Sequence, residues 1–183
     1  APKITKIKDA KNDEEKTIIT GFTTLGLYAI ENTYGKKIED PNETLELPNM
    51  HQVAEAWGIK VRYERVAGAW GYFSPTAKEI VLGTEDQSVY FHELAHAAHL
   101  KIDGKLQSGQ DPEQEAIAQL SAAVLSRMYG VKVDNDTFKY IANYTKSNKP
   151  DAVARMCMRV AEKTSQVIEL ILTTKKEIEV QAV

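Results

Sequence analysis

The chain has 183 residues, of which 43% are hydrophobic and 27% are charged, with a net charge of −3 and one cysteine. This composition is typical of a globular protein with a buried core; it excludes an internal disulfide and gives no overall attraction for nucleic acid. No run approaches the ~20 consecutive apolar residues of a membrane-spanning helix and no secretory signal pattern opens the sequence, so we expect a cytoplasmic protein with no membrane partner.

The N-terminal stretch is rich in Lys, Asp, Glu and Asn, with Ile4 and Ile7 as its large apolar residues. We predict a flexible charged arm over 1–16, followed by one single domain over 17–183. Apolar and β-branched residues over 18–30 predict one or two strands, and the polar segment that follows predicts a loop.

A small sheet is predicted in the first half of the domain. Apolar residues recur at helical spacing over 48–57, just before Gly58, which indicates a short helix. Apolar and charged residues then alternate over 59–64, the pattern of a half-buried strand. Two apolar runs, 69–73 and 79–82, flank a Ser-Pro-Thr-Ala turn and predict a β-hairpin.

The second half has helical periodicity. Thr84 and Gln87 match a capping box and predict a helix over about 85–100. Asp111 and Pro112 are a strong helix start. The further predicted helices span about 112–129, 135–145 and 151–174. The fold class is therefore α+β, with a small N-terminal mixed sheet followed by a mainly helical half.

The motif with chemical meaning is His92-Glu93-Leu94-Ala95-His96, an H-E-x-x-H sequence on a predicted helix. Residues four apart share one helix face, so both imidazoles can bind one Zn²⁺ ion. Glu93 is then placed to act on a zinc-bound water as general base. The alternative is a chance pattern on a buried helix, which the clustering of three of the four histidines argues against.

A catalytic zinc site needs a third protein ligand. The metzincin pattern is excluded, because Ile102 stands where its third histidine would follow His96. Glu113 and Glu115 on the next predicted helix both qualify. We choose Glu115, which borders the apolar face, since Glu113 sits in the first turn where a capping acid belongs. The predicted cofactor is one Zn²⁺ per chain.

Two further polar residues are candidates near the zinc. Gln119 shares a helix face with Glu115 and would hydrogen-bond a ligand imidazole, with a solvated surface glutamine as the alternative. His99 lies about 10 Å along the helix axis from His92, too far to bind the same ion. His99 would hydrogen-bond to a metal ligand, contact the substrate, or be a surface histidine whose hydrogen bonds are satisfied.

These residues resemble the C-terminal metallopeptidase domain of ArdC-type antirestriction proteins, over roughly 24–172. The resemblance implies a zincin-like fold of the gluzincin type, with His92, His96 and Glu115 as ligands and Glu93 as acid and base. A shorter match exists to the repressor-cleaving zinc peptidases of mobile elements. The segments that carry the family resemblance are 71–75 ahead of Ile80, 92–96, 114–123, and the tail from Tyr140 through the helix that contains Ala161.

The sequence departs from that family in two respects. Gln119 stands where an acidic residue is usual, and the N-terminal single-stranded-DNA-binding domain of full-length relatives has no counterpart here, so direct nucleic-acid binding is not expected. The resemblance implies a setting on plasmids, phages or integrative elements. Its partners would be a peptide or protein substrate, with a restriction or repressor protein as the target.

We therefore predict a zinc-dependent endopeptidase, with strand 79–82 as the sheet edge that pairs with substrate. No Tyr or His occurs between Gly104 and Gln114, where some gluzincins place an electrophile, which leaves Tyr72, Tyr90 and Tyr129 as candidates. Two alternatives remain open. One is a non-catalytic zincin-fold protein that inhibits a restriction enzyme or nuclease. The other is a contribution to DNA binding by the arm lysines Lys3, Lys6, Lys8 and Lys11.

Overall fold

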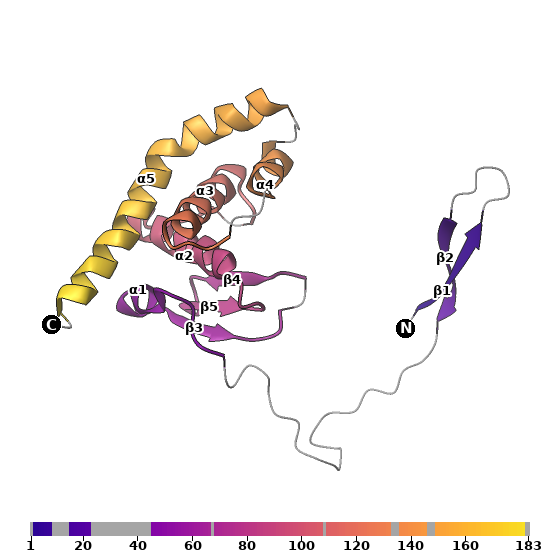
Figure 1. Ribbon diagram of the computed structural model, residues 1–183, viewed down its shortest axis with the longest axis horizontal. Coiled ribbons are helices and arrows are strands. Elements are labelled where there is room, and N and C mark those ends of the chain that lie inside the picture. The colour runs from indigo at the N-terminus through magenta and orange to yellow at the C-terminus, as the bar shows by residue number, and fades with distance from the viewer. Residues whose placement is uncertain are drawn as a thin grey trace, which may run out of the picture. The chain divides into compact units, whose positions relative to one another are not determined.

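The computed structural model describes residues 2–8, 15–22, 45–66, 68–107, 109–132, 136–145 and 149–181. The chain forms two compact units, 1–39 and 40–183. In the first unit, β1 (Pro2–Lys8) and β2 (Glu15–Phe22) pair as antiparallel strands (Figure 1).

Strand β1 lies where sequence analysis placed a flexible arm, and β2 crosses the expected boundary at residue 16. Backbone pairing explains the difference, since Ile4 lies opposite Ile19 and Thr5 opposite Ile18. A strand with few large apolar residues shows little alternation of apolar and polar residues in its own sequence. Its stability depends on pairing with the neighbouring strand, which the local sequence does not reveal. The predictions for residues 23–44 lie outside the described residues.

The second unit contains a three-stranded sheet in the order β3-β5-β4. Strand β5 (Glu79–Leu82) pairs antiparallel with β4 (Gly71–Ser74), so the predicted hairpin is confirmed. It also pairs parallel with β3 (Lys60–Tyr63). The prediction that strand 79–82 forms the sheet edge was therefore wrong: β5 is central, and β4 is the edge strand on the other side from β3.

Five helices of this unit lie within the described residues: α1 (His51–Ala56), α2 (Gln87–Asp103), α3 (Pro112–Met128), α4 (Asp136–Thr145) and α5 (Pro150–Gln181). Each coincides with a predicted helix, although α5 continues well beyond residue 174. Together with the small sheet they confirm the predicted α+β architecture with a mainly helical second part. Across the described residues, no helix is long and apolar enough to cross a membrane.

The start of α2 differs from the predicted capping box. Asp86 is the N-cap, and its carboxylate accepts from the backbone N–H of Ser88 at 2.9 Å. Gln87 instead exchanges two hydrogen bonds with the backbone of Asn49, at 2.9 and 3.1 Å. The side chain assigned to capping thus ties α2 to the segment before α1.

Helix α2 is the centre of the unit and contacts β4, β5, α3 and α5 (Figure 1). Its alanines at 95, 97 and 98 are buried, which allows the neighbouring backbones to approach closely. The buried residues of α3 also include small ones, namely Ala116, Ala118, Ser121, Ala122 and Ser126. The H-E-x-x-H motif therefore sits on a helix that is held by packing on several sides. The fully buried large side chains include Tyr90, Phe91, Leu94, Ile80, Leu82 and Leu125.

Candidate metal centre

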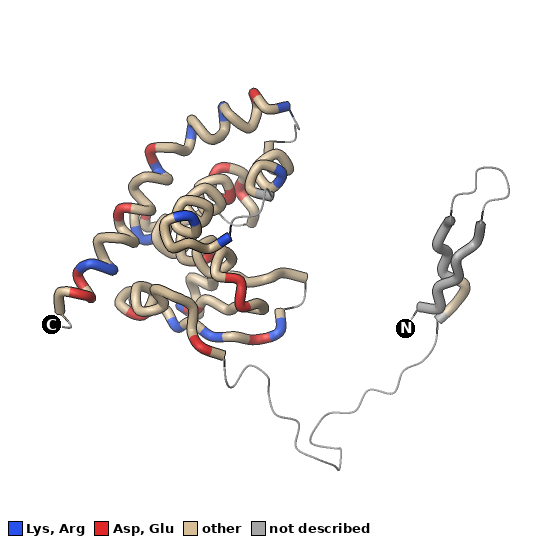
Figure 2. Tube along the Cα trace, viewed as in Figure 1, with Lys and Arg blue, Asp and Glu red and all other residues tan. Residues whose placement is uncertain are grey.

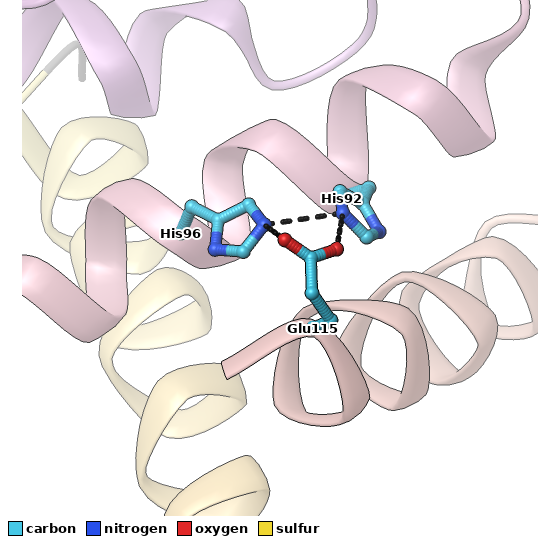
Figure 3. Close-up of side chains that lie close together, drawn as sticks. All are labelled: His92, His96 and Glu115. Carbon is cyan, nitrogen blue, oxygen red and sulfur yellow. Dashed lines mark hydrogen bonds and ion pairs between the residues drawn. The ribbon is translucent and has the colours of Figure 1, made fainter. Parts of the chain in front are cut away.

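Helices α2 and α3 bring two histidines and one glutamate together. The Nε2 atoms of His92 and His96 are 3.1 Å apart. Oε2 of Glu115 lies 3.4 Å from Nε2 of His92, and Oε1 of Glu115 lies 3.6 Å from Nε2 of His96. The three side chains point toward one another from the two helices (Figure 3).

These distances fit a metal ion held by three protein ligands. A tetrahedral zinc site with bonds of about 2.0–2.1 Å has donor atoms separated by roughly 3.3 Å. The separations of 3.1, 3.4 and 3.6 Å lie close to that value. Two imidazoles and one carboxylate are also a donor set that catalytic zinc uses, and it leaves a fourth position for water.

The start of α3 determines where Glu115 lies. The Asp111 carboxylate accepts from the backbone N–H groups of Glu113 and Gln114, and Pro112 occupies the first turn. Glu113 points elsewhere and pairs with Arg159 at 2.9 Å. Glu115 is the buried member of the two candidates, and it is the one that faces the histidines.

Gln119 orients the first histidine. Its Oε1 lies 3.2 Å from Nδ1 of His92, and its amide donates to Thr137 at 3.4 Å. Because an amide oxygen only accepts, Nδ1 of His92 carries the proton that faces Gln119, and in the neutral imidazole Nε2 is the nitrogen with the lone pair. This tautomer is the one that can bind a metal through Nε2.

Sequence analysis missed Tyr140. Its hydroxyl donates to Oε2 of Glu115 at 2.7 Å, and its ring lies edge-on to His92 at a centroid distance of 5.6 Å. Tyr144 in turn donates to the Tyr140 hydroxyl at 3.4 Å. Tyr140 and Tyr144 are four residues apart on a predicted helix, so the sequence indicates that they share one helix face. It does not indicate which other element that face contacts.

Two of the three tyrosines proposed from the sequence lie elsewhere. Tyr90 is fully buried and donates to the carbonyl of Met50 at 3.0 Å. Tyr129 packs against Phe91. Neither lines the cavity at the metal centre, whereas Tyr72 does.

His99 is also away from the metal centre. It is buried, which contradicts the surface alternative, and its Nε2 lies 3.0 Å from Oδ2 of Asp103. Lys163 of α5 pairs with the same carboxylate at 2.7 Å. These three residues line a separate hollow of about 570 Å³. His99 therefore contacts the carboxylate of Asp103 on its own helix, and Asp103 in turn joins the end of α2 to α5 through Lys163.

Glu93 is only 8% exposed and lines the same cavity as the three ligands. Burial raises the pKa of its carboxyl above the usual range, and Glu115 raises it further. The His92 imidazole and a hydrogen bond with the backbone of Phe73 oppose that shift. A carboxyl with a raised pKa exchanges protons more readily near neutral pH, as a general base and acid must.

Two of the three candidate ligands, His96 and Glu115, have pKa shifts that suit metal binding. Burial alone would lower the pKa of His92, but its hydrogen bond with Glu115 and the nearby charge of Glu93 raise it overall, so a bound cation would displace that proton. Burial, together with nearby His92, lowers the pKa of His96 to about 4, so its imidazole is neutral. Burial would raise the pKa of Glu115, but hydrogen bonds from His92 and Tyr140 outweigh it and the net shift is downward. A neutral imidazole and an ionised carboxylate are the forms that bind cations.

The metal centre lies in a cavity of about 1060 Å³. Its walls come from α2, α3, α4 and the edge strand β4, with Tyr72 and Phe73 on one side and Tyr140 and Tyr144 on another. This volume is large for a single small molecule.

No protein-family model and no curated protein matches the chain. Among solved structures it is similar to the Mn(II)-bound crystal structure of antirestriction ArdC protein from the R388 plasmid, with 16% identity and a TM-score of 0.51 over 95% of this chain and 68% of that one. The metal-free structure of the same protein gives 14% identity and a TM-score of 0.42 over 94% and 69%. The chain thus has an ArdC-like fold.

Proposed function

We propose that this chain is a zinc-dependent endopeptidase of the antirestriction type. The observation that carries the proposal is the set of donor distances among His92, His96 and Glu115, with Glu93 in the same cavity. A bound zinc ion would lower the pKa of a water molecule toward 7 and polarise a peptide carbonyl.

Glu93 is the acid and base in this proposal. Its carboxylate accepts a proton from the attacking water and returns it to the amide nitrogen that leaves. Its raised pKa favours holding that proton between the two events. The hydrogen bond with the backbone of Phe73 fixes the carboxyl against strand β4.

Strand β4 is the surface on which we place the substrate. The Trp70 carbonyl accepts from the N–H of Gly83 at 2.7 Å. Alternation in an antiparallel ladder then directs the backbone groups of Tyr72 and Ser74 to β5 and those of Gly71 and Phe73 to the outer edge. An extended peptide that pairs there would run beside Glu93 and would use the outward backbone groups other than the Phe73 N–H, which donates to Glu93.

The antirestriction role is supported by the ArdC-like fold. In this proposal the substrate is a protein of the host's restriction or repressor systems, cleaved in an unfolded or extended segment. The competing function is inhibition of a restriction enzyme by contact alone, with the metal in a structural role. The two functions differ in whether Glu93 is needed.

The test compares wild type with Glu93→Gln. We expect the variant to keep the metal content of wild type, measured by plasma mass spectrometry, because Glu93 is not among the three ligands. Cleavage of a disordered protein such as casein should fall by at least ~100-fold, the scale of a lost general base. Retained cleavage would exclude the assigned role.

A matched control is Glu113→Gln, which changes a glutamate on α3 that pairs with Arg159 outside the centre. It should leave cleavage and metal content unchanged. Protection of DNA from restriction in cells is measured for the same variants. Full protection by Glu93→Gln would favour inhibition by contact over proteolysis.

A further inference from the structure

Two large aromatic side chains are exposed beside the metal centre. Trp70 is 73% exposed and Tyr72 is 39% exposed, yet both line the cavity that holds Glu93. They are two residues apart, so they lie on one face of the strand. Gly71 and Phe73 face the other way: a side chain at Gly71 would meet Val89 of α2, and Phe73 packs against the core.

Tyr72 lies in the short edge strand β4 and Trp70 immediately precedes it, and neither charge nor proline blocks the outer edge of this strand. Natural edge strands are usually blocked by charged residues, prolines or bulges. Here residues 66–77 contain no Asp, Glu, Lys or Arg, and β4 itself contains no proline. Figure 2 shows the described part of this segment without a charged residue. An uncharged edge with exposed aromatic rings is the surface of a binding site.

We propose that Trp70 and Tyr72 form an aromatic platform for a large apolar side chain of an extended peptide. The peptide's backbone would pair with the outer edge of β4, and one of its side chains would lie across the two rings. The proposal rests on the proposed function in that the peptide is the substrate, and it adds a preference for Phe, Leu or similar residues near the cleaved bond.

A single-stranded nucleic acid could also stack on these rings, but the surrounding charges disfavour it. Such sites combine aromatic platforms with basic grooves that follow the phosphates. The 66–77 segment supplies no cation. The cavity next to it is lined by three carboxylates, of Asp86, Glu93 and Glu115, and by two lysines, Lys105 and Lys132, so it is not a basic groove. An uncharged peptide segment meets none of this repulsion.

Tryptophan fluorescence tests the proposal without turnover. The chain has two tryptophans, and Trp57 is half-buried, with its indole N–H donating to Thr174 at 3.2 Å. In the 183-residue chain with Glu93→Gln, Trp57→Phe leaves Trp70 as the only fluorescent tryptophan. The probes are a ten-residue peptide with one central Phe and the same peptide with Ser. We expect the Phe peptide to shift the Trp70 emission and to bind roughly 10-fold more tightly.

A second variant covers the case in which Trp57→Phe does not fold. With Trp57 retained, Trp70→Ala should weaken binding of a dye-labelled Phe peptide roughly 10-fold, while Trp70→Phe keeps most of the affinity and both keep their metal. Equal affinity for the two peptides, or a Trp70 response to an oligothymidylate but not to peptide, would overturn the platform. If the chain with Glu93 intact binds the Phe peptide but does not cleave it, the proposed peptidase function would be wrong and the aromatic platform would stand.

Discussion

Tyr140 on helix α4 donates to Oε2 of Glu115, the same oxygen that lies 3.4 Å from Nε2 of His92. Burial raises the pKa of its phenol, as do its contacts with Tyr144 and Glu115, so the hydroxyl remains protonated and donates. A hydrogen bond of 2.7 Å to a ligand fixes the orientation of that ligand. Tyr140 is therefore a positioning residue for the metal centre.

Substitution Tyr140→Phe should weaken zinc affinity about 10-fold, the usual lower limit for losing a hydrogen bond to a metal ligand. Competition with a chromophoric chelator measures the dissociation constant. Tyr63→Phe is the control, since Tyr63 lies on β3 and does not line the cavity. An unchanged constant in Tyr140→Phe would show that Glu115 is held by other contacts.

Local sequence was enough to propose the three ligands, but not the residues around them. His92 and His96 follow from helical spacing, and Glu115 follows from the cap at Asp111 and the apolar face beginning at Ala116. Tyr140 is 25 residues further along the chain, and its role depends on how α4 packs across α3. No local pattern contains that information.

At the level of elements, the close contact between α2 and β4 positions the motif helix against the edge strand on which we propose that substrate binds. Gly71 permits this contact, because a Cβ there would lie 2.9 Å from a methyl of Val89 and 3.1 Å from the Val81 carbonyl. Both separations are shorter than van der Waals contact. The absence of a side chain at Gly71 thus sets the spacing of strand and helix.

Gly71→Ala should lower the free energy of unfolding by about 1–3 kcal/mol, as overpacking does in a close-packed core. Urea unfolding measures it. Gly21→Ala is a matched control, since a Cβ there meets nothing within 4 Å. Adding Val89→Ala to Gly71→Ala should recover part of the loss, and no recovery would place the strain at the Val81 carbonyl alone.

The pair between Asp103 of α2 and Lys163 of α5 predicts a pH-dependent contribution to stability. The Lys163 ammonium holds the pKa of the Asp103 carboxyl below its usual range. Because the folded-state pKa is depressed, the stabilisation is complete above the unfolded value of about 3.8 and is lost as the pH falls through the folded value.

Lys163→Gln should therefore cost about 0.5 kcal/mol at pH 7, a modest figure because both side chains are partly exposed. In melting temperature this is about 1–2 °C. The difference from wild type should close as the pH falls below the depressed folded-state pKa of Asp103. Thermal unfolding monitored by circular dichroism over that range is the measurement, and a difference that persists in acid would assign the effect to packing of the lysine stem.

The helices were predictable from the sequence because each carries its own periodicity, cap or stop, whereas the order of the strands was not. The parallel pairing of β3 with β5 joins segments that are 16 or more residues apart and depends on the whole sheet. The cap of α2 shifted from Thr84 to Asp86 for a related reason. The side chain of Gln87 hydrogen-bonds to the backbone of Asn49, which lies too far away in the sequence for a local pattern to indicate it.

On the scale of the whole molecule, the metal centre and the core belong to the same unit. The buried hydrophobic cluster runs from Met50 to Ile171, and the three ligands come from two helices within it. The first unit, 1–39, has its own strand pairing. Metal binding should therefore be coupled to the stability of the second unit alone.

A chain shortened to 40–183 should bind one zinc ion per molecule with the affinity of the full chain. Zinc at about 100 times its dissociation constant adds roughly 2.7 kcal/mol to the stability of the folded state, which corresponds to a rise in melting temperature of roughly 5–10 °C. Calorimetry should show this rise equally in both chains. Glu115→Ala should abolish most of it, because the loss of one of three ligands weakens binding to the folded state. A rise in the full chain but not in 40–183 would mean that residues 1–39 complete the metal centre or its fold.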